Sequence, residues 1–246
     1  MINVSAPRVS AARPLNAGTS RIAGVDGCRG GWVAAVLDPA TGALGLHLAP
    51  RWADLPADLA VVCVDMPIGL ADRGRRGCDA LARALLPRGR KSSVFPAPRR
   101  PMLAFERWAE ANDWGKRQDG VGLTIYAWGL MAKIRELDGA LGPADQARVR
   151  ESHPELAFHR MSGGRALPPK RTPAGRAARR ALLEAEGFDR LDDWLGLYPR
   201  ALVQPDDVLD ACACLVTARR VVRGDAIRLP DAPPRDARGL AMEIWY

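Results

Sequence analysis

The sequence predicts an α/β fold in which helices flank a mixed sheet. Short apolar runs typical of strands fill residues 22–65, and segments with helical spacing follow residue 76. A long helix rich in small apolar residues is expected near the C-terminus. Strands, then a helical insertion, then a closing helix indicate a mixed sheet flanked by helices, and this order alone leaves the strand topology open.

Three strands are expected first, as a meander. Ile22–Asp26 is a short apolar run that ends in an acid, and a glycine-rich turn over residues 27–31 follows it. Trp32–Leu37 is apolar and β-branched, and Leu44–Leu48 comes after a further turn. Leu59–Asp65 (LAVVCVD) is apolar throughout, as in a strand buried on both faces, and it too ends in Asp.

Helical spacing begins after Arg76. We expect helices over Cys78–Leu86, Met102–Asn112 and Leu123–Leu137, because apolar residues recur there every three or four positions. In the third of these helices, Tyr126 belongs to the apolar face.

The last third of the chain is expected to hold a strand and two helices. Val149–Phe158 fits a strand, which Pro154 restricts to an edge or a bulge. A basic segment, residues 168–180, leads into one helix. The final helix, Asp206–Val222, is closed by Gly224.

Composition argues for one domain and against membrane attachment. With 246 residues, 48% of them hydrophobic, we expect a single domain over residues 21–246 after a disordered leader in residues 1–20. No run approaches the roughly 18 to 20 apolar residues of a membrane span, and residues 1–20 lack the apolar stretch of a signal peptide. The five cysteines lie mostly in apolar segments, typical of free thiols in a reducing compartment. We therefore expect a cytoplasmic protein.

The chain carries a formal net charge of +8, and only four of its 36 basic residues are Lys. Clusters of basic residues favour a polyanion partner such as nucleic acid. The alternative is solvated surface charge, since GC-rich codon usage alone produces an excess of Arg. The residues expected to contact nucleic acid are Arg29, Arg88, Arg90, Lys91, Arg99, Lys133, Lys170 and Arg171.

Asp26 and Asp65 each end an apolar strand, and the carboxyl ends of central strands are where α/β sheets bind ligands. Carboxylates brought together at an apolar core are unfavourable unless a cation neutralises them or one takes up a proton. Oxygen ligands select Mg²⁺ or Mn²⁺, and two such ions roughly 3.5–4 Å apart stabilise both the attacking and the leaving oxygen of phosphoryl transfer.

Asp207 and Asp210 add a further acidic pair. They lie three residues apart at the start of the last helix and so share one of its faces. The alternative is helix capping, with Asp207 as the N-cap and Asp210 close to completing a capping box. The run that follows, DACACLV, is small and apolar, as a helix packed closely on a sheet requires.

Glu151 and Glu155 flank His153 in the sequence RESHPE. Either glutamate is a candidate to complete the metal shell, and His153 is a candidate for proton transfer. The alternative is a polar edge strand that faces water.

The glycine-rich turn GVDGCRGG leads into a strand, so it does not match a dinucleotide fingerprint, which opens a helix. It either admits a phosphate backbone beside Asp26, with Arg29 at its tip, or is simply a tight turn.

Several blocks of the chain form a recognisable series. They are GVDGCRGGW (Gly24–Trp32), VDMPIGL (Val64–Leu70), RGCDALAR (Arg76–Arg83), SSVFPAP (Ser92–Pro98), AKIRELD (Ala132–Asp138), ESHPELAF (Glu151–Phe158) and DDVLDACACLVTARR (Asp206–Arg220). In this order they resemble the blocks of an uncharacterised prokaryotic family, domain-of-unknown-function family 429, described as predicted nucleases with a ribonuclease H-like fold.

The resemblance implies a mixed sheet that begins with three antiparallel strands. It also implies metal-binding acids at the ends of the first and fourth strands and a further acid on the last helix. Asp26, Asp65 and Asp210 occupy those places, with Asp207 as an auxiliary. The ribonuclease H-like fold often has Glu at the fourth-strand position, where this chain has the shorter Asp65.

The leading hypothesis is a nuclease with a two-metal mechanism, in which Asp26 bridges both ions and Asp65 and Asp210 hold one each. The first alternative is a catalytically inactive nucleic-acid-binding module of the same fold. The second is an actin-like ATP-binding phosphotransferase, which clamps its nucleotide between two copies of the fold, whereas this chain has one GVDG-like turn.

In a nuclease, residues 88–100 and 170–180 are expected to follow the substrate backbone. Trp108, Trp114 and Trp128 are either base-stacking residues or, as their helical spacing favours, core residues.

Overall fold

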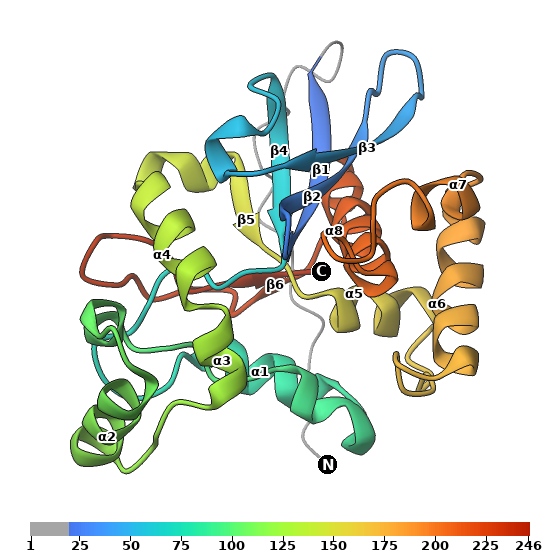
Figure 1. Ribbon diagram of the computed structural model, residues 1–246. Helices are drawn as coiled ribbons and strands as arrows, with labels where there is room; N and C mark the ends of the chain where they lie inside the picture. Colours follow the sequence, from blue (N-terminus) through green and yellow to red (C-terminus); the bar gives the residue numbers. More distant parts are fainter. Residues whose placement is uncertain (1–19) are drawn as a thin grey trace.

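The computed structural model describes residues 20–246 (Figure 1). The leader expected over residues 1–20 lies outside the described residues, apart from Ser20. None of the helices in the described range combines the length and the apolar composition that crossing a membrane requires. All five cysteines are buried and free, as the sequence predicts.

Five strands form one mixed sheet with the order β3-β2-β1-β4-β5. β1 (Arg21–Cys28), β2 (Gly31–Leu37) and β3 (Leu44–Ala49) are the predicted antiparallel meander. β4 (Leu59–Val64) pairs in parallel with β1, and the short β5 (Val149–Glu151) pairs in parallel with β4. β1 and β4 therefore lie at the centre, with their carboxyl ends at the same edge of the sheet.

A two-residue turn joins β1 to β2. Cys28 pairs with Gly31, and Arg29 is exposed at the tip of the hairpin, as predicted. Gly31 has a φ of +129°, and a Cβ there would lie 2.1 Å from the carbonyl oxygen of Ala49. This turn therefore requires glycine both for its backbone conformation and for the close approach of the next strand.

Helix α8 (Pro205–Arg223) packs on one face of the sheet and is one residue longer at each end than predicted (Figure 1). It ends at Gly224, which adopts the left-handed conformation of a helix C-cap. A Cβ on Gly24 of β1 would lie 1.9 Å from the amide nitrogen of Leu215 and 2.2 Å from the carbonyl oxygen of Ala211. The strand backbone and the helix backbone are thus in direct contact, which only a glycine and small helix residues allow.

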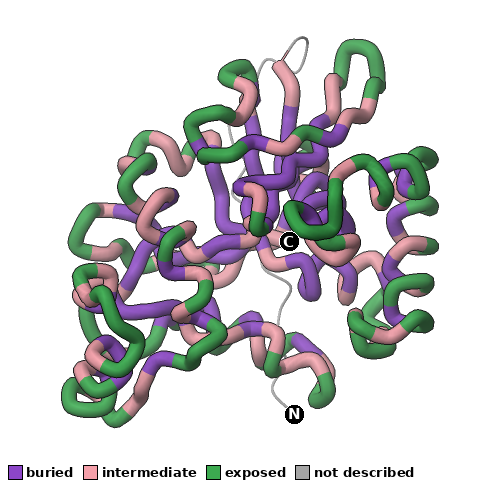
Figure 2. Tube along the Cα trace, viewed as in Figure 1, coloured by how far each residue is buried: buried purple, intermediate pink, exposed green. Residues whose placement is uncertain are grey.

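Helix α4 (Met131–Ala140) covers the opposite face. Its Ile134 and Leu137 join a core to which β4 contributes Val62 and Val64, while the alternate residues of β4 face α8. Figure 2 shows most of the central strands and the middle of α8 as buried segments. This burial on both faces agrees with the uninterrupted apolar sequence of β4.

The predicted helix Met102–Asn112 is wrong in its bounds. A 3-10 turn η3 (Arg100–Ala104) comes first, and α2 (Trp108–Asp119) follows. The break is stabilised from outside, because the guanidinium of Arg135 donates to the carbonyl oxygens of Leu103, at 2.7 Å, and of Phe105. Apolar periodicity does not reveal such a long-range contact.

The predicted single helix Leu123–Leu137 is also wrong. It consists of α3 (Ile125–Gly129) and α4, which meet at Leu130. Gly129 weakens the continuous helix by about 1 kcal/mol relative to alanine. The break turns Tyr126 away from the buried face, and its side chain is 60% exposed.

The strand expected over Val149–Phe158 is wrong beyond Glu151. β5 stops there, and α5 (Pro154–Met161) begins three residues later. Pro154 occupies the first turn of that helix, where its fixed φ and missing N–H are favourable, so it marks a helix start rather than a strand edge.

The remaining elements complete the two helical layers and a second, two-stranded sheet. They are η1 (Trp52–Asp54), α1 (Gly77–Leu85), η2 (Arg88–Ser93), η4 (Pro143–Ala147), α6 (Pro173–Ala185), α7 (Leu191–Leu195), β6 (Arg228–Leu229) and β7 (Ile244–Trp245).

Replacing Gly24 with alanine tests the contact between α8 and β1. The added methyl group has no space against the helix backbone, so we expect Gly24→Ala to lower the free energy of unfolding by about 3 kcal/mol. Gly139→Ala is the matched control, because Gly139 lies in α4 with nothing within 4 Å of its Cβ position. Urea unfolding measures both variants, and equal stabilities would contradict the proposed constraint.

Candidate functional site

Asp26 and Asp65 lie side by side at the carboxyl ends of β1 and β4. The register pairs Val25 with Val64, and the amide nitrogen of Asp65 donates to the carbonyl oxygen of Val25 at 2.9 Å. Because side chains alternate along a strand, Asp26 shares the face of Gly24, against which α8 packs. The register of these two strands therefore directs both carboxylates towards α8.

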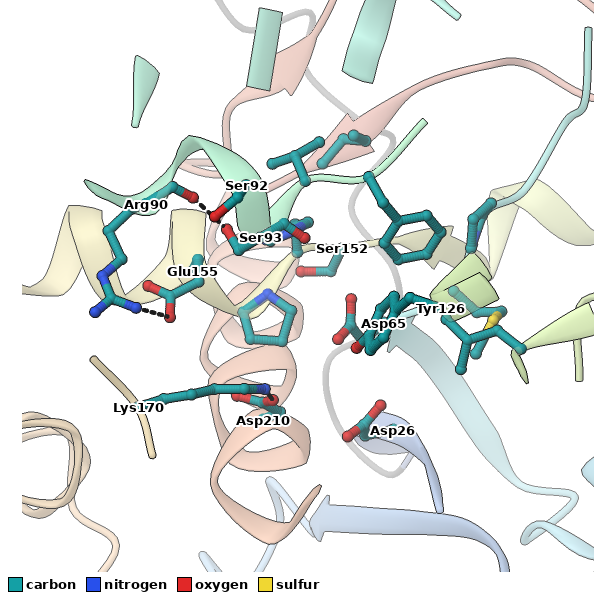
Figure 3. Close-up of a pocket in the computed structure, with 18 of the residues that line it drawn as sticks. Asp26, Asp65, Arg90, Ser92, Ser93, Tyr126, Ser152, Glu155, Lys170 and Asp210 are labelled. Atoms are coloured by element: carbon teal, nitrogen blue, oxygen red, sulfur yellow. Dashed lines mark hydrogen bonds and ion pairs between the residues drawn. The ribbon is translucent and has the colours of Figure 1, made fainter. Parts of the chain in front are cut away.

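Asp210 reaches the same point from α8. One carboxylate oxygen from each of Asp26, Asp65 and Asp210 lies within 4.8 Å of the other two. Asp26 and Asp210 are 8% and 6% exposed, and Asp65 is half-buried. Figure 3 shows the three side chains directed into a common space. We call this group the acid triad, and it consists of the three residues that the sequence predicts as metal ligands.

Crowding and burial raise pKa values within the triad. Burial, followed by the charges of Asp65 and Asp210, raises the pKa of Asp26 well above its ordinary value. Burial and then the charge of Asp210 raise the pKa of Asp65 to about 8. Without a compensating cation, these carboxyl groups hold protons at pH values where ordinary aspartates are ionised.

Lys170 lies against the triad. Its Nζ is 2.8 Å from Oδ2 of Asp210, and the charge of Asp210 is the main cause of its raised pKa. The sequence predicts Lys170 only as a contact to a substrate backbone, whereas the structure joins it to an acid 40 residues away. One ammonium reduces the formal charge of the three carboxylates from −3 to −2.

Asp207 caps α8 but is not its N-cap residue. The N-cap is Gln204, whose amide nitrogen donates to Oδ2 of Asp207 at 2.8 Å, so the expected N-cap position of Asp207 is wrong by three residues. The half-buried Asp207 lines the same cavity as the triad. Burial, opposed by the bond from Gln204, raises its pKa to about 6. Its capping bond leaves Asp207 as an auxiliary to the triad rather than a member.

Glu151 lies outside the triad, in a buried ion pair. Nη1 and Nη2 of Arg76 each donate to a different oxygen of Glu151 at 2.7 Å, and the amide of Ile68 donates to it at 2.7 Å. Arg76 also pairs with the buried Asp79. This bidentate contact occupies the carboxylate that the sequence offers as a metal ligand, and it fixes the end of β5 to the segment after β4.

Glu155 is likewise engaged. It pairs with the buried Arg179 of α6, and Nη1 of Arg90 lies 3.9 Å from it.

Nε2 of His153 lies 3.3 Å from the carbonyl oxygen of Ser93, so this nitrogen must carry the proton. Burial lowers the pKa of His153, and its buried Nδ1 has no partner among the described residues. A neutral imidazole whose Nδ1 is free to accept a proton is the form that a general base requires.

A cavity of about 440 Å³ connects these groups (Figure 3). The acid triad, Lys170 and Asp207 line it, and so do Gly89, Arg90 and residues 92–95 of the segment after α1. Phe95 and Tyr126 contribute aromatic surface. The cavity thus combines negative charge, hydroxyl groups and aromatic rings in one space.

The predicted basic contacts divide into several environments. Arg99 is a correction, because it is buried, pairs with Asp119 and donates to the carbonyl oxygen of Val121, so it cannot reach an external strand. Lys133 lies over the ring of Trp32, with Nζ 4.7 Å from the ring centroid. Arg29 and Arg88 are exposed, Lys91 is half-buried, and Arg90, Lys170 and Arg171 line the cavity.

The aromatic residues at the cavity are not the ones that the sequence offers for base stacking. Trp108 donates its Nε1 proton to the carbonyl oxygen of Leu123 at 2.7 Å, and Trp114 and Trp128 pack on the core formed around α2 and α3. Tyr126 and Phe95 line the cavity instead. The sequence points to Phe95 only as part of the block SSVFPAP. Apolar periodicity assigns Tyr126 to a buried helix face.

The acid triad fits a divalent cation. Carboxylate oxygens are the ligands that hard cations select, and the formal charge of −2 left after Lys170 is the charge that one such ion balances. No described residue donates a hydrogen bond to the carboxylate of Asp65, whose neighbours act on it through charge alone. A bound cation would supply the compensation that this carboxylate lacks.

The fold and the site define an α/β protein with a five-stranded mixed sheet, in an arrangement consistent with the ribonuclease H-like fold, and with a buried acidic triad that can bind a metal ion. The family model described as "Protein of unknown function (DUF429)" matches residues 24–235. The chain therefore belongs to this family, as the sequence blocks indicate. Neither a curated protein nor a solved structure matches the chain.

Asp65→Asn tests the electrostatic strain of the metal-free triad. The folded chain keeps the Asp65 proton up to about pH 8, while the unfolded chain releases it near its ordinary pKa of 3.8. The unfolded state then binds fewer protons, so this group lowers stability as pH rises from about 4 to about 8. In chelator at pH 8, we expect Asp65→Asn to gain about 1 kcal/mol, or roughly 2–4 °C in Tm, with no gain at pH 4.

The exposed Asp113 on α2 provides the control, and Asp113→Asn should change Tm little at either pH. Thermal unfolding followed by circular dichroism gives both values. A gain for Asp65→Asn that is equally large at pH 4 would show that charge is not its cause.

Glu151→Gln separates a structural role of this residue from a metal-binding one. Glu151→Gln removes the bidentate carboxylate contact and leaves Arg76 with Asp79 as its carboxylate partner, so we expect a loss of about 2 kcal/mol of stability from the weakened hydrogen bonds. Glu110→Gln, in an exposed pair with Arg107, should have little effect. Calorimetry at a temperature where Glu151→Gln remains folded should find unchanged Mg²⁺ affinity, and a large loss of affinity would instead place Glu151 among the ligands.

Proposed function

We propose that this protein is a metal-dependent nuclease that hydrolyses phosphodiester bonds of nucleic acid. The observation that carries the proposal is the convergence of Asp26, Asp65 and Asp210 at the carboxyl ends of two parallel strands, where they line a cavity of about 440 Å³. An acidic site that needs a cation and is bordered by basic side chains is suited to an anionic substrate. Membership in a family of unknown function is compatible with this activity and does not establish it.

The three aspartates would hold Mg²⁺ or Mn²⁺, with Asp207 available as an auxiliary acid. When bound, the cation supplies a Lewis acid for the phosphate oxygens and for the charge that develops as the ester bond breaks. One divalent ion neutralises the triad together with Lys170. A second ion, as a two-metal mechanism requires, would depend on the charge of Asp207 or of the substrate phosphate itself.

Basic side chains beside the triad would bind the substrate. Arg90 and Arg171 line the cavity beside Lys170, where they can hold phosphate oxygens and orient the strand. His153 has a free Nδ1 acceptor and lines the same cavity, so it is the candidate to take up or return a proton. These roles divide positioning and proton transfer between side chains that lie outside the triad.

A catalytically inactive nucleic-acid-binding module is the second candidate. The contact between Lys170 and Asp210 favours it, because an ammonium already neutralises part of the charge for which a metal ion would be needed. In this reading the basic side chains around the cavity bind the phosphate backbone and no bond is cleaved.

A cleavage panel decides between the two candidates. Single- and double-stranded DNA, RNA, hybrids and four-way junctions are incubated with the protein in chelator, Mg²⁺ or Mn²⁺. We expect metal-dependent cleavage that Asp26→Asn lowers by at least about 100-fold, since even outer partners of a metal site are worth 10- to 100-fold. Asp113→Asn, which carries the same charge change on the surface, should retain full activity.

Binding is measured in parallel by fluorescence anisotropy at several salt concentrations. Asp26→Asn should bind at least as tightly as the wild type, because it removes one negative charge near the phosphate. The logarithm of the binding constant should fall linearly with log[salt]. Salt-dependent binding without cleavage of any substrate would support the inactive module and overturn the nuclease.

A further inference from the structure

We infer that the cavity takes one unpaired nucleotide of the substrate strand, with its base against an aromatic wall formed by Tyr126 and Phe95 and its phosphate at the acid triad. This inference rests on the proposed function and narrows it to strands that present an unpaired base at the scissile bond. A single strand, a strand end or an extruded base meets that condition.

The aromatic wall consists of the exposed Tyr126 and the half-buried Phe95. Ile125 and Tyr126 are 65% and 60% exposed, the two largest values among the large hydrophobic side chains of the described range. The ring of Tyr126 meets that of Phe95 edge to face, with centroids 5.5 Å apart and an interplanar angle of 72°. Both rings line the cavity, whereas Ile125 does not. Exposed aromatic surface beside a phosphate-binding site is typical of base stacking.

The wall is close to the triad. Figure 3 shows Tyr126 next to Asp65, with Asp26 and Asp210 facing the same space. A nucleotide whose phosphate lies at the acids would therefore have its sugar and base within reach of this ring.

The burial of the acids favours an unpaired nucleotide over an intact duplex at the site. Asp26 and Asp210 are nearly buried, and the cavity of about 440 Å³ falls within the range of roughly 300–1,000 Å³ that holds small ligands. A duplex presents its phosphates on a convex cylinder, so an unpaired nucleotide fits such a cavity better than an intact duplex does. A nucleotide that leaves the stack can enter.

Hydroxyl groups of the segment that carries Phe95 also line the cavity. Ser92 is exposed, Ser93 donates its hydroxyl proton to the carbonyl oxygen of Arg90 at 2.7 Å, and both residues line the cavity. A hydroxyl both donates and accepts, so it can bond the edge of any base. Stacking is equally tolerant of base identity, and we therefore expect weak sequence preference.

Binding of a fluorescent base tests the inference. Oligonucleotides with a single 2-aminopurine are titrated with the Asp26→Asn protein, which keeps the wall and prevents turnover. Stacking on the wall should change the emission of the single strand, while in a perfect duplex the base stays paired and its emission should not change. A free 2-aminopurine nucleotide in a third arm distinguishes binding of a strand from binding of a mononucleotide, which should be much weaker without the flanking phosphates.

Three second-site variants separate the ring from its surroundings. Tyr126→Ala should lower single-strand affinity roughly 5- to 150-fold, the range expected for loss of one stacked base, and abolish the emission change. Tyr126→Phe should retain both. Ile125→Ala, which removes an equally exposed neighbour outside the cavity, should leave both unchanged.

The outcomes separate this inference from the proposed nuclease. If the emission change depends on Tyr126 but the wild-type protein cleaves no substrate, the pocket is supported and the nuclease is overturned. Metal-dependent cleavage whose KM is the same for wild type and Tyr126→Ala, without any emission change, would overturn the pocket and leave the nuclease standing. Equal binding of Tyr126→Ala and Ile125→Ala would also overturn the pocket.

Discussion

The close contact of α8 with β1 is the constraint on which the rest of the site depends. Because Gly24 has no side chain, the helix backbone reaches the strand backbone, and only a helix of small residues can occupy that position. The same contact brings Asp210 to the ends of the strands that carry Asp26 and Asp65. Any displacement of α8 would move one acid of the triad relative to the other two, so packing and chemistry are set by one interaction.

The electrostatic strain of the triad is sustained by that packing. Carboxylates held together in a buried place raise the pKa of Asp26 and Asp65 and lower the stability of the metal-free fold. The apolar core on both faces of the sheet offsets this cost, and Lys170 reduces it without removing it. A site that remains under-neutralised in a well-packed core is poised to gain stability from a cation, which is what a binding site for such an ion requires.

The strands and the triad could be predicted from the sequence because each depends on local pattern. Apolar runs that end in Asp26 and Asp65 fix which residues reach the sheet edge, and their parallel pairing brings them together. Residues whose role depends on a distant partner could not be predicted. Arg99 looks like a surface cation until Asp119 is found beside it, and Tyr126 fits a buried stripe until the helix breaks at Leu130. Apolar periodicity describes a single helix or strand, whereas the burial of a charged side chain depends on its partner in a different element.

Arginine pairing divides the acids of the cavity into two groups. Glu151 and Glu155 each pair with a buried arginine, although Glu151 shares Arg76 with Asp79 and burial raises its pKa to about 7, whereas the triad has a single lysine among three carboxylates. The largest excess of carboxylates over cations in the cavity therefore lies at the acid triad, and Tyr126 and Phe95 line the same cavity. A ligand that carries both a metal-binding anion and a flat ring can satisfy both features only in one orientation, with the anion at the sheet and the ring at Tyr126. The position of the unpaired acids at one end of the cavity therefore follows from which carboxylates the arginines occupy.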